Sequence, residues 1–370
     1  MKGRYLKAMN YQIAVIPGDG IGPEVINEGI KVIEAVQRRI PGLSLKFTRY
    51  KAGADCYRET GIPFPKEAYK ACIEADAIYL GAVGYPDVLM PDGTEIAGEV
   101  VLKLRFDLDL YAGVRPIKLY PGIDSVLKGR TAGDIDYVIL RENTEGLYAS
   151  RGGGNLLRGE VTTDTMVLTR KGTERIIRYA FELAKKRKGA PKDGRKRVTC
   201  VDKANVLKSY AFFRKIYHEV ARDYPDIDRD YAYIDAMVLW MNQIPEHYDV
   251  IVTENMFGDI ISDLAASTVG GMGMAPSGDI GDHHAVFQPS HGTAPTLAGK
   301  GIANPLATIL SGSMMLEWLG SRHRDAQALE AAQKIEEAVT RVLAEGKVRT
   351  PDIGGSAKTW EVGDAIVERL

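Results

Sequence analysis

Short apolar runs alternate with longer amphipathic stretches along most of the chain, and this alternation predicts an α/β architecture. Apolar runs rich in β-branched residues predict buried strands at 13–16, 75–80, 137–140, 198–201 and 249–252. Helical periodicity predicts helices at 23–39, 173–187, 204–224, 304–319 and 326–344. Because strands and helices alternate, we expect a largely parallel sheet.

Composition then narrows the class of protein. The 370 residues can form two domains or one large one, and 45% apolar with 26% charged residues is typical of a globular enzyme. Lys plus Arg number 48 against 49 Asp plus Glu, so no net charge attracts nucleic acid or an anionic membrane. The three cysteines are widely spaced, and the first apolar run is too short for a signal peptide or a membrane span. We therefore expect a cytoplasmic protein with reduced thiols.

A glycine-rich string, PGDGIGPEV at 17–25, follows the first predicted strand. Gly18, Gly20 and Gly22 permit a tight turn and a close approach of the backbone to a ligand or to another segment. The spacing is GxGxG, which is not the GxGxxG fingerprint of a Rossmann fold. The string therefore predicts a strand–helix turn and leaves open whether it also binds a ligand.

Three arginines and a tyrosine could bind and protonate an anionic substrate. Arg105, Arg115 and Arg141 offer planar forks that grip carboxylates, so they suit a substrate with two carboxylates or a developing enolate. Tyr148, placed near the end of a predicted strand, could act as a general acid. The alternatives are surface arginines in salt bridges and a tyrosine that is simply packed.

Acidic residues and one lysine suggest a metal-dependent site. Asp259 and Asp263 share one face if a helix opens there, and two adjacent carboxylates suit Mg²⁺ or Mn²⁺. Asp235 is a candidate third ligand. Lys203, predicted to end a strand and open a helix, could become a base if positive neighbours lower its pKa. The alternatives are an acidic first helical turn that faces the helix dipole and an ordinary exposed lysine.

A loop of small residues, at 291–305, precedes a predicted helix and could lie against an adenosine. Asn304 could read a base edge, whereas His291 could equally be a structural histidine. His218, Cys200 and the pair His283-His284 have no spacing typical of zinc ligands.

Together these strings resemble the β-decarboxylating dehydrogenase family of isocitrate, 3-isopropylmalate, homoisocitrate and tartrate/D-malate dehydrogenases. The resemblance covers nearly the whole chain and is carried, in order, by PGDGIGPEV, LRFDLDLYAGVRP, RENTEGLY, VDKANVL, IDAM, ENMFGDIISD, HGTAPTLAGKGIANP and TPDIGGSAKT. It implies a two-domain fold with a mostly parallel sheet. Residues 1–110 and 270–370 would form a large cofactor-binding domain, and residues 111–269 a small domain for substrate, metal and dimerisation.

The resemblance also implies a role for each candidate residue. A homodimer would share its active sites, with Lys203 and Asp235 of one subunit meeting Asp259 and Asp263 of the other. Lys203 would take the hydroxyl proton and Tyr148 would protonate the enol. The implied groups are the carboxylate clamp Arg105, Arg115 and Arg141; an apolar wall of Val100, Val101, Leu102 and Val206; the Mg²⁺ or Mn²⁺ ligands Asp235, Asp259 and Asp263; and the cofactor residues His291, Gly292, Thr293, Ala294, Thr296 and Asn304.

Departures from the family pattern bear on cofactor and substrate. Many NAD-using relatives carry Asp where this chain has Thr296, and NADP-using relatives place Lys-Tyr there, so Thr296-Leu297 favours NAD over NADP. If NADP were preferred, the candidates for its phosphate would be Arg322, Arg324 and Arg349. Gln288 replaces a carboxylate that is usual before the histidine.

The positions that hold the third carboxylate of isocitrate in bacterial relatives are Glu99 and Val101 here. The pocket therefore favours 3-isopropylmalate or another alkyl-substituted malate. Tartrate or D-malate comes next, followed by isocitrate or homoisocitrate. A non-catalytic binding protein is disfavoured because every implied catalytic residue is present.

Overall fold

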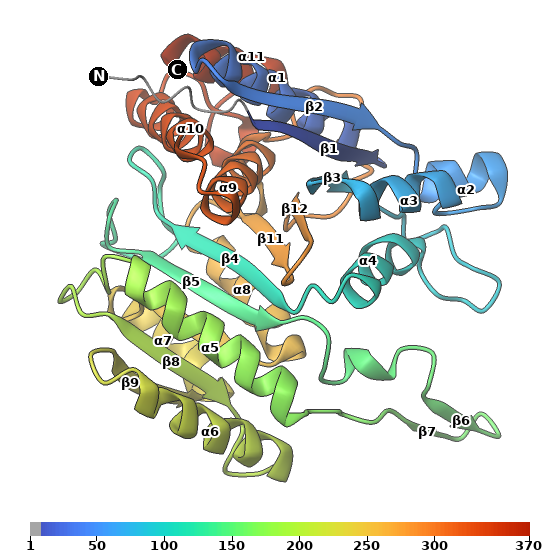
Figure 1. Cartoon of the computed structure of the whole chain (residues 1–370), viewed down its shortest axis with the longest axis vertical. Coiled ribbons are helices and arrows are strands. Elements are labelled where there is room, and N and C mark those ends of the chain that lie inside the picture. Colours follow the sequence, from blue (N-terminus) through green and yellow to red (C-terminus); the bar gives the residue numbers. More distant parts are fainter. Residues whose placement is uncertain (1–8) are drawn as a thin grey trace, which may run out of the picture.

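A computed structural model describes residues 9–370, and its centre is one ten-stranded sheet (Figure 1). The strand order is β2-β1-β3-β12-β11-β4-β5-β10-β8-β9. The strands of this sheet are β1 (Met9–Gly18), β2 (Leu43–Arg49), β3 (Ala77–Ala82), β4 (Ala112–Lys118), β5 (Asp136–Glu142), β8 (Arg197–Asp202), β9 (Asp228–Tyr233), β10 (Val250–Thr253), β11 (Pro276–Ile280) and β12 (Ala285–Pro289). A separate hairpin of β6 (Asn155–Leu157) and β7 (Val161–Thr163) projects from the body of the molecule (Figure 1).

Most of the pairings are parallel, as the α/β prediction requires. The strands β2, β1, β3 and β12 pair in parallel with one another, and so do β5, β10, β8 and β9. The two groups are joined through β11 and β4, whose pairings are antiparallel. The ends of the chain therefore build one half of the sheet and its middle builds the other. The division into two domains stays a prediction.

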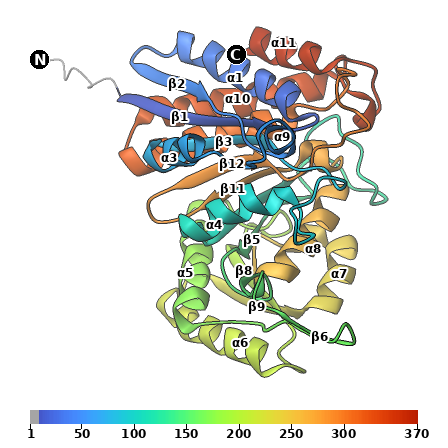
Figure 2. The same cartoon turned by 90° about the vertical axis from the view of Figure 1, so that its right-hand side faces the viewer.

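Helices cover both faces of this sheet. In the half built by the middle of the chain, α5 and α6 lie on one face and α7 and α8 on the other (Figure 2). In the other half, α1 packs against α9 and α11. The helices are α1 (Gly22–Arg39), α2 (Ala54–Thr60), α3 (Lys66–Glu74), α4 (Lys103–Asp107), α5 (Arg170–Lys186), α6 (Lys208–Val220), α7 (Ile234–Gln243), α8 (Asn255–Ser267), α9 (Leu306–His323), α10 (Ala326–Glu345) and α11 (Thr359–Arg369). Within residues 9–370, no helix combines the length and apolarity needed to cross a membrane.

Each predicted strand and helix has a counterpart, but two local predictions were wrong. The helix expected from residue 204 begins at Lys208, because Lys203 and the residues after it form a turn. Lys203 therefore follows a strand without opening a helix. Tyr148 was expected near a strand end, but β5 ends at Glu142 and Tyr148 begins a short 3₁₀ helix, Tyr148–Ser150.

The glycine-rich string forms the turn between β1 and α1, and its glycines are required by close packing. Gly18 and Gly20 have positive φ angles of 73° and 57°. A Cβ at Gly20 would lie 2.1 Å from the carbonyl oxygen of Thr293, so this turn packs directly on the 291–305 loop. The buried Asp19 fixes the turn by accepting hydrogen bonds from the backbone of Ala54 and Asp55, among others.

Candidate active site

The three predicted arginines come together at the junction of the two halves of the sheet. Arg115 lies on β4 and Arg141 on the antiparallel neighbour β5, while Arg105 comes from α4. All three are buried, with exposed fractions of 6% for Arg105, 7% for Arg115 and 2% for Arg141. The alternative of surface salt bridges is therefore wrong.

Asp259 on α8 is the shared partner of two of these arginines and of the tyrosine. Arg141 pairs with its Oδ1, and Arg115 Nη2 lies 3.3 Å from the same oxygen. The Tyr148 hydroxyl donates to Asp259 Oδ2 at 2.9 Å. Asp263, one turn further along α8, lies 3.5 Å from Arg115 Nη1. Guanidinium, phenol and carboxylate groups predicted from separate motifs thus form one cluster.

Charge and burial set the protonation states within this cluster. Burial raises the pKa of Tyr148, and the neighbouring Asp259 raises it further, so the phenol stays protonated at neutral pH. Burial alone would also raise the pKa of Asp259, but Arg141 and Arg115 bring it below its ordinary value. Burial and the charges of Arg105 and Arg115 lower the pKa of Arg141. The result is a proton donor held beside an ionised carboxylate.

A buried acidic residue that the sequence analysis missed fixes Arg105. Asp279 on β11 is 1% exposed and accepts a hydrogen bond from Arg105 Nε at 2.9 Å. It also accepts from Asn143 Nδ2 at 2.7 Å and from Gln288 Nε2 at 2.9 Å. Gln288, noted above for replacing a carboxylate, is thus a donor to Asp279. Only the antiparallel β11–β4 pairing brings this residue to the cluster, so no local motif marks it.

The cluster opens onto a cavity of about 460 Å³. Val101 and Leu102, predicted as part of an apolar wall, line it from a π-helix at Gly98–Leu102. The full lining is Thr94, Glu95, Ala97, Gly98, Val101, Leu102, Arg105, Arg115, Arg141, Tyr148, Arg151 and Asp259. Cationic and apolar surfaces therefore face the same space, which suits a small carboxylic acid with an apolar substituent.

Lys203, Val206 and Asp235 do not line this cavity. Lys203 forms an ion pair with Asp235, and the side chain of Asp235 is exposed. Val206 is 65% exposed. Within one chain, these three residues therefore stay apart from the arginine cluster.

The described residues of one chain bring together only two of the three predicted ligands for a divalent cation, Asp259 and Asp263. Among residues 9–370, no group of three or more His, Cys, Asp or Glu side chains could hold a metal ion. Asp259 and Asp263 supply hard oxygen atoms on one face of α8, as predicted, but a third ligand must come from elsewhere.

The loop at 291–305, which was predicted to bind the cofactor, lies on the glycine-rich turn. Thr293 is buried and donates to the carbonyl oxygen of Gly84 at 2.7 Å, whereas Gly292 and Thr296 are exposed. Ala294 has a positive φ of 39°.

His291 and Asn304 differ in their free polar atoms. The buried Nε2 of His291 has no hydrogen-bond partner among the described residues. Burial lowers the pKa of His291, which favours the neutral ring. Asn304 donates to Asp352 at 3.0 Å and accepts from the backbone of Leu306, so both ends of its amide are already bonded. Of these two side chains, His291 is therefore the one with an unpaired nitrogen among the described residues.

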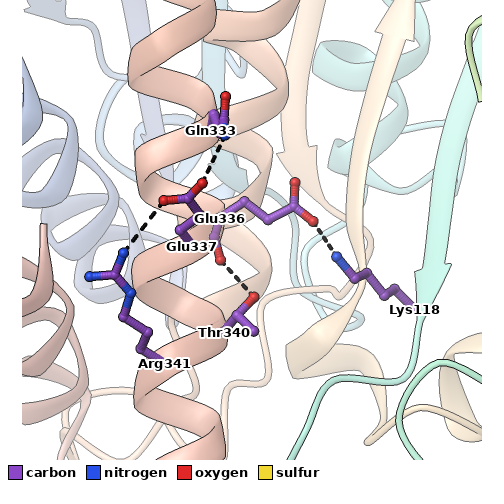
Figure 3. A pocket seen from close by; sticks show the side chains of 6 residues that line it. All are labelled: Lys118, Gln333, Glu336, Glu337, Thr340 and Arg341. Carbon is purple, nitrogen blue, oxygen red and sulfur yellow. Dashed lines mark hydrogen bonds and ion pairs between the residues drawn. The ribbon is translucent and has the colours of Figure 1, made fainter.

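A second cavity, of about 300 Å³, lies between β4 and α10 (Figure 3). Its charged side chains neutralise one another: Lys118 pairs with Glu336, and Arg341 lies 3.5 Å from Glu337. None of the predicted site residues lines it. The arginine cluster therefore remains the candidate site.

Comparisons with known proteins identify the family of the chain. A family model described as isocitrate/isopropylmalate dehydrogenase matches residues 12–366. The chain is 45% identical to 3-isopropylmalate/3-methylmalate dehydrogenase of Methanocaldococcus jannaschii, with 97% of this chain and 99% of the relative covered. It is 41% identical to the decarboxylating D-malate dehydrogenase of Escherichia coli, with 96% and 97% covered. The crystal structure of isocitrate dehydrogenase from Methylococcus capsulatus superposes with a TM-score of 0.84 at 38% identity, covering 97% of this chain and 99% of the other.

Proposed function

Because the chain belongs to the isocitrate/isopropylmalate dehydrogenase family, we propose that it oxidises and decarboxylates an alkyl-substituted malate with NAD, and 3-isopropylmalate is the first candidate. The family match confirms the predicted family, and the similarity to the solved isocitrate dehydrogenase structure confirms the predicted α/β fold. The observation that carries the substrate class is the cavity itself, where buried arginines face Val101 and Leu102. Carboxylates need the cations, and an alkyl group needs the apolar wall.

The residues of this chain would divide the chemistry among them. Arg105, Arg115 and Arg141 hold the substrate carboxylates. Lys203 of the partner subunit accepts the hydroxyl proton, and Tyr148 donates a proton to the enol after CO₂ has left. When bound, Mg²⁺ or Mn²⁺ supplies Lewis-acid polarisation, and NAD supplies the hydride acceptor.

A homodimer would complete the site, and exposed apolar side chains support this proposal. On α8, Ile260 lies between Asp259 and Asp263 in the sequence and is 58% exposed. Further exposed apolar residues lie on α7, after β8 and on the projecting hairpin: Val206, Leu207, Val238, Leu239, Trp240, Leu156, Leu157 and Val161. Apolar surface of this kind commonly marks a protein interface. The proposed interface therefore adjoins the cluster that lacks a third metal ligand.

The preference for NAD rests on the surroundings of Thr296. Arg322 and Arg324 lie at the C-terminal end of α9, whereas Thr296 precedes its N-terminal end. Leu306, at the start of α9, and Arg322, near its end, are about 24 Å apart along the helix axis at about 1.5 Å per residue. Both arginines therefore lie at the far end of α9 from the end at which the 291–305 loop enters it, and Arg349 stays the remaining candidate for a phosphate.

The direct test is NADH formation by the purified protein with Mn²⁺, NAD and a panel of acids. The panel contains 3-isopropylmalate, 3-methylmalate, D-malate, tartrate, isocitrate and homoisocitrate. We expect the highest kcat/KM with a 3-alkylmalate. The highest value with D-malate or tartrate would select that function instead, and no turnover with any acid would refute the enzyme assignment.

A further inference from the structure

The three arginines of the cluster are not held equally. Arg115 and Arg141 share Asp259, and each has a further side-chain partner on α8. Among the described residues, the guanidinium of Arg105 has one side-chain partner, Asp279 on β11. The orientation of Arg105 therefore depends on a single carboxylate.

The bond to Asp279 uses only one corner of this guanidinium. Arg105 Nε donates to Asp279 Oδ2 at 2.9 Å, and the two terminal nitrogens of Arg105 have no hydrogen-bond partner among the described residues. Arg105 lines the cavity, whereas Asp279 does not. Because a guanidinium can grip a carboxylate through its terminal nitrogens, Asp279 holds the arginine without occupying those atoms.

The sheet also fixes Asp279 itself. Its Oδ1 accepts a hydrogen bond from Asn143 Nδ2 at 2.7 Å, and its Oδ2 also accepts from Gln288 Nε2 at 2.9 Å. Asp279 lies opposite Gly113 of β4. A Cβ at Gly113 would lie 2.7 Å from Asn143 Oδ1, so glycine there leaves the space that Asn143 occupies. Two further donors thus hold the carboxylate in place.

We propose that Asp279 is a positioning residue, which orients Arg105 so that its terminal nitrogens meet one carboxylate of a bound diacid at a fixed place. This inference rests on the proposed function, in which the substrate is a diacid. Asp279 acts through Arg105 and does not touch the substrate. A preoriented arginine spares the ligand the entropic cost of ordering a long side chain, and it favours diacids whose carboxylates match its position.

The test uses two diacids of equal charge and composition, maleate and fumarate, whose double bond fixes the two carboxylates cis or trans. Calorimetry on the Mn²⁺-loaded protein gives the ratio of their dissociation constants. Loss of the negative charge in Asp279→Asn should strengthen the binding of both dianions alike, so the ratio reports orientation. We expect wild type to prefer one isomer about tenfold or more, because a charge-assisted hydrogen bond to Arg105 forms with only one of them. Asp279→Asn should reduce this preference to less than about threefold.

Two further variants show whether Asp279 acts through Arg105. Asp279→Glu keeps the charge but displaces it by one methylene group, so it should also lower the ratio, and it preserves the test if Asp279→Asn does not fold. In the Arg105→Met background, the addition of Asp279→Asn should change the ratio less than about twofold.

Asp282→Asn is the matched control. Asp282 is exposed, accepts a hydrogen bond from the Tyr111 hydroxyl at 3.3 Å and forms no ion pair among the described residues. Its substitution should leave the ratio within about twofold of wild type.

Three results would overturn the role given to Asp279. These are a wild-type ratio near one, an unchanged ratio in both Asp279 variants, and a fall of equal size in the Arg105→Met background. The binding measurements need no turnover. Absence of NADH formation with every acid would therefore refute only the proposed function.

Discussion

Replacement of Asp279 by alanine tests how the arginine cluster is held in place. Asp279 and Arg105 are 1% and 6% exposed, and the substitution removes the acceptor for Arg105, Asn143 and Gln288 together. Removal of one partner from a buried ion pair costs about 3–5 kcal/mol, because the remaining charge stays buried without compensation. We therefore expect Asp279→Ala to lower the free energy of unfolding by about that amount at pH 7.

The measurement is urea unfolding of wild type and variant, with Glu74→Ala as the control. Lys70 and Glu74 form a 3.6 Å ion pair, but their side chains are 74% and 65% exposed. Such a surface pair contributes at most about 1 kcal/mol. A loss for Asp279→Ala no larger than that of the control would refute the buried-pair argument.

The same variant has a predictable pH dependence. Burial alone would raise the pKa of Asp279, but Arg105 and its hydrogen bond, with Arg115 and Arg141, bring it below the ordinary value. A carboxyl group with a lowered folded pKa stabilises the protein above its unfolded pKa, about 3.9. That contribution to the free energy of unfolding is lost as the pH falls through the pKa of Asp279 in the folded protein. The difference in free energy of unfolding between wild type and Asp279→Ala should therefore be largest at pH 7 and should shrink below about pH 4. A difference that stays constant over this pH range would contradict the charge argument.

Three further predictions concern the chemistry. EDTA should abolish turnover, and Asp259→Asn should weaken Mn²⁺ binding by more than about tenfold; full activity after exhaustive chelation would exclude a metal. Tyr148→Phe removes the proton donor, so it should slow decarboxylation of the oxo-acid intermediate about 100-fold while affecting hydride transfer less. Equal effects on both steps, measured separately, would refute the assigned role. Thr296→Asp should raise kcat/KM with NAD about tenfold through charge-assisted bonds to the ribose hydroxyls, and should lower it with NADP; a wild-type preference for NADP would reverse the cofactor proposal.

Much of the site was predictable because its chemistry lies in short strings. Arg141 and Asp259 each sit within a distinctive motif, and the structure joins them on neighbouring elements, β5 and α8. Asp279 was missed because its partnership with Arg105 spans 174 positions and depends on an antiparallel strand that the periodicity did not predict. Arg151, which lines the cavity and lies 2.8 Å from Glu99, was missed because it follows the 3₁₀ turn of Tyr148 in an irregular segment and belongs to no recognised motif. Contacts between residues so far apart in the sequence leave no local pattern from which they can be predicted.

The boundary predictions failed where the backbone leaves regular structure. Lys203 begins a turn in which the backbone N–H groups of Val206 and Leu207 donate to the Lys203 carbonyl oxygen, and α6 therefore begins only at Lys208. Tyr148 similarly reaches Asp259 from a 3₁₀ turn. In both cases the amino-acid types indicated the chemistry, whereas the tertiary contacts set the geometry.

Shared active sites require Lys203 of one chain to complete the site that contains Asp259 of the partner subunit. Co-expression of Lys203→Met and Asp259→Asn chains with different affinity tags allows purification of the mixed dimer. Shared sites would leave one of its two sites with both wild-type residues, so the mixed dimer should regain about half of wild-type activity while each variant homodimer is inactive. A mixed dimer as inactive as the two homodimers would show that each site lies within a single chain, and would contradict the account.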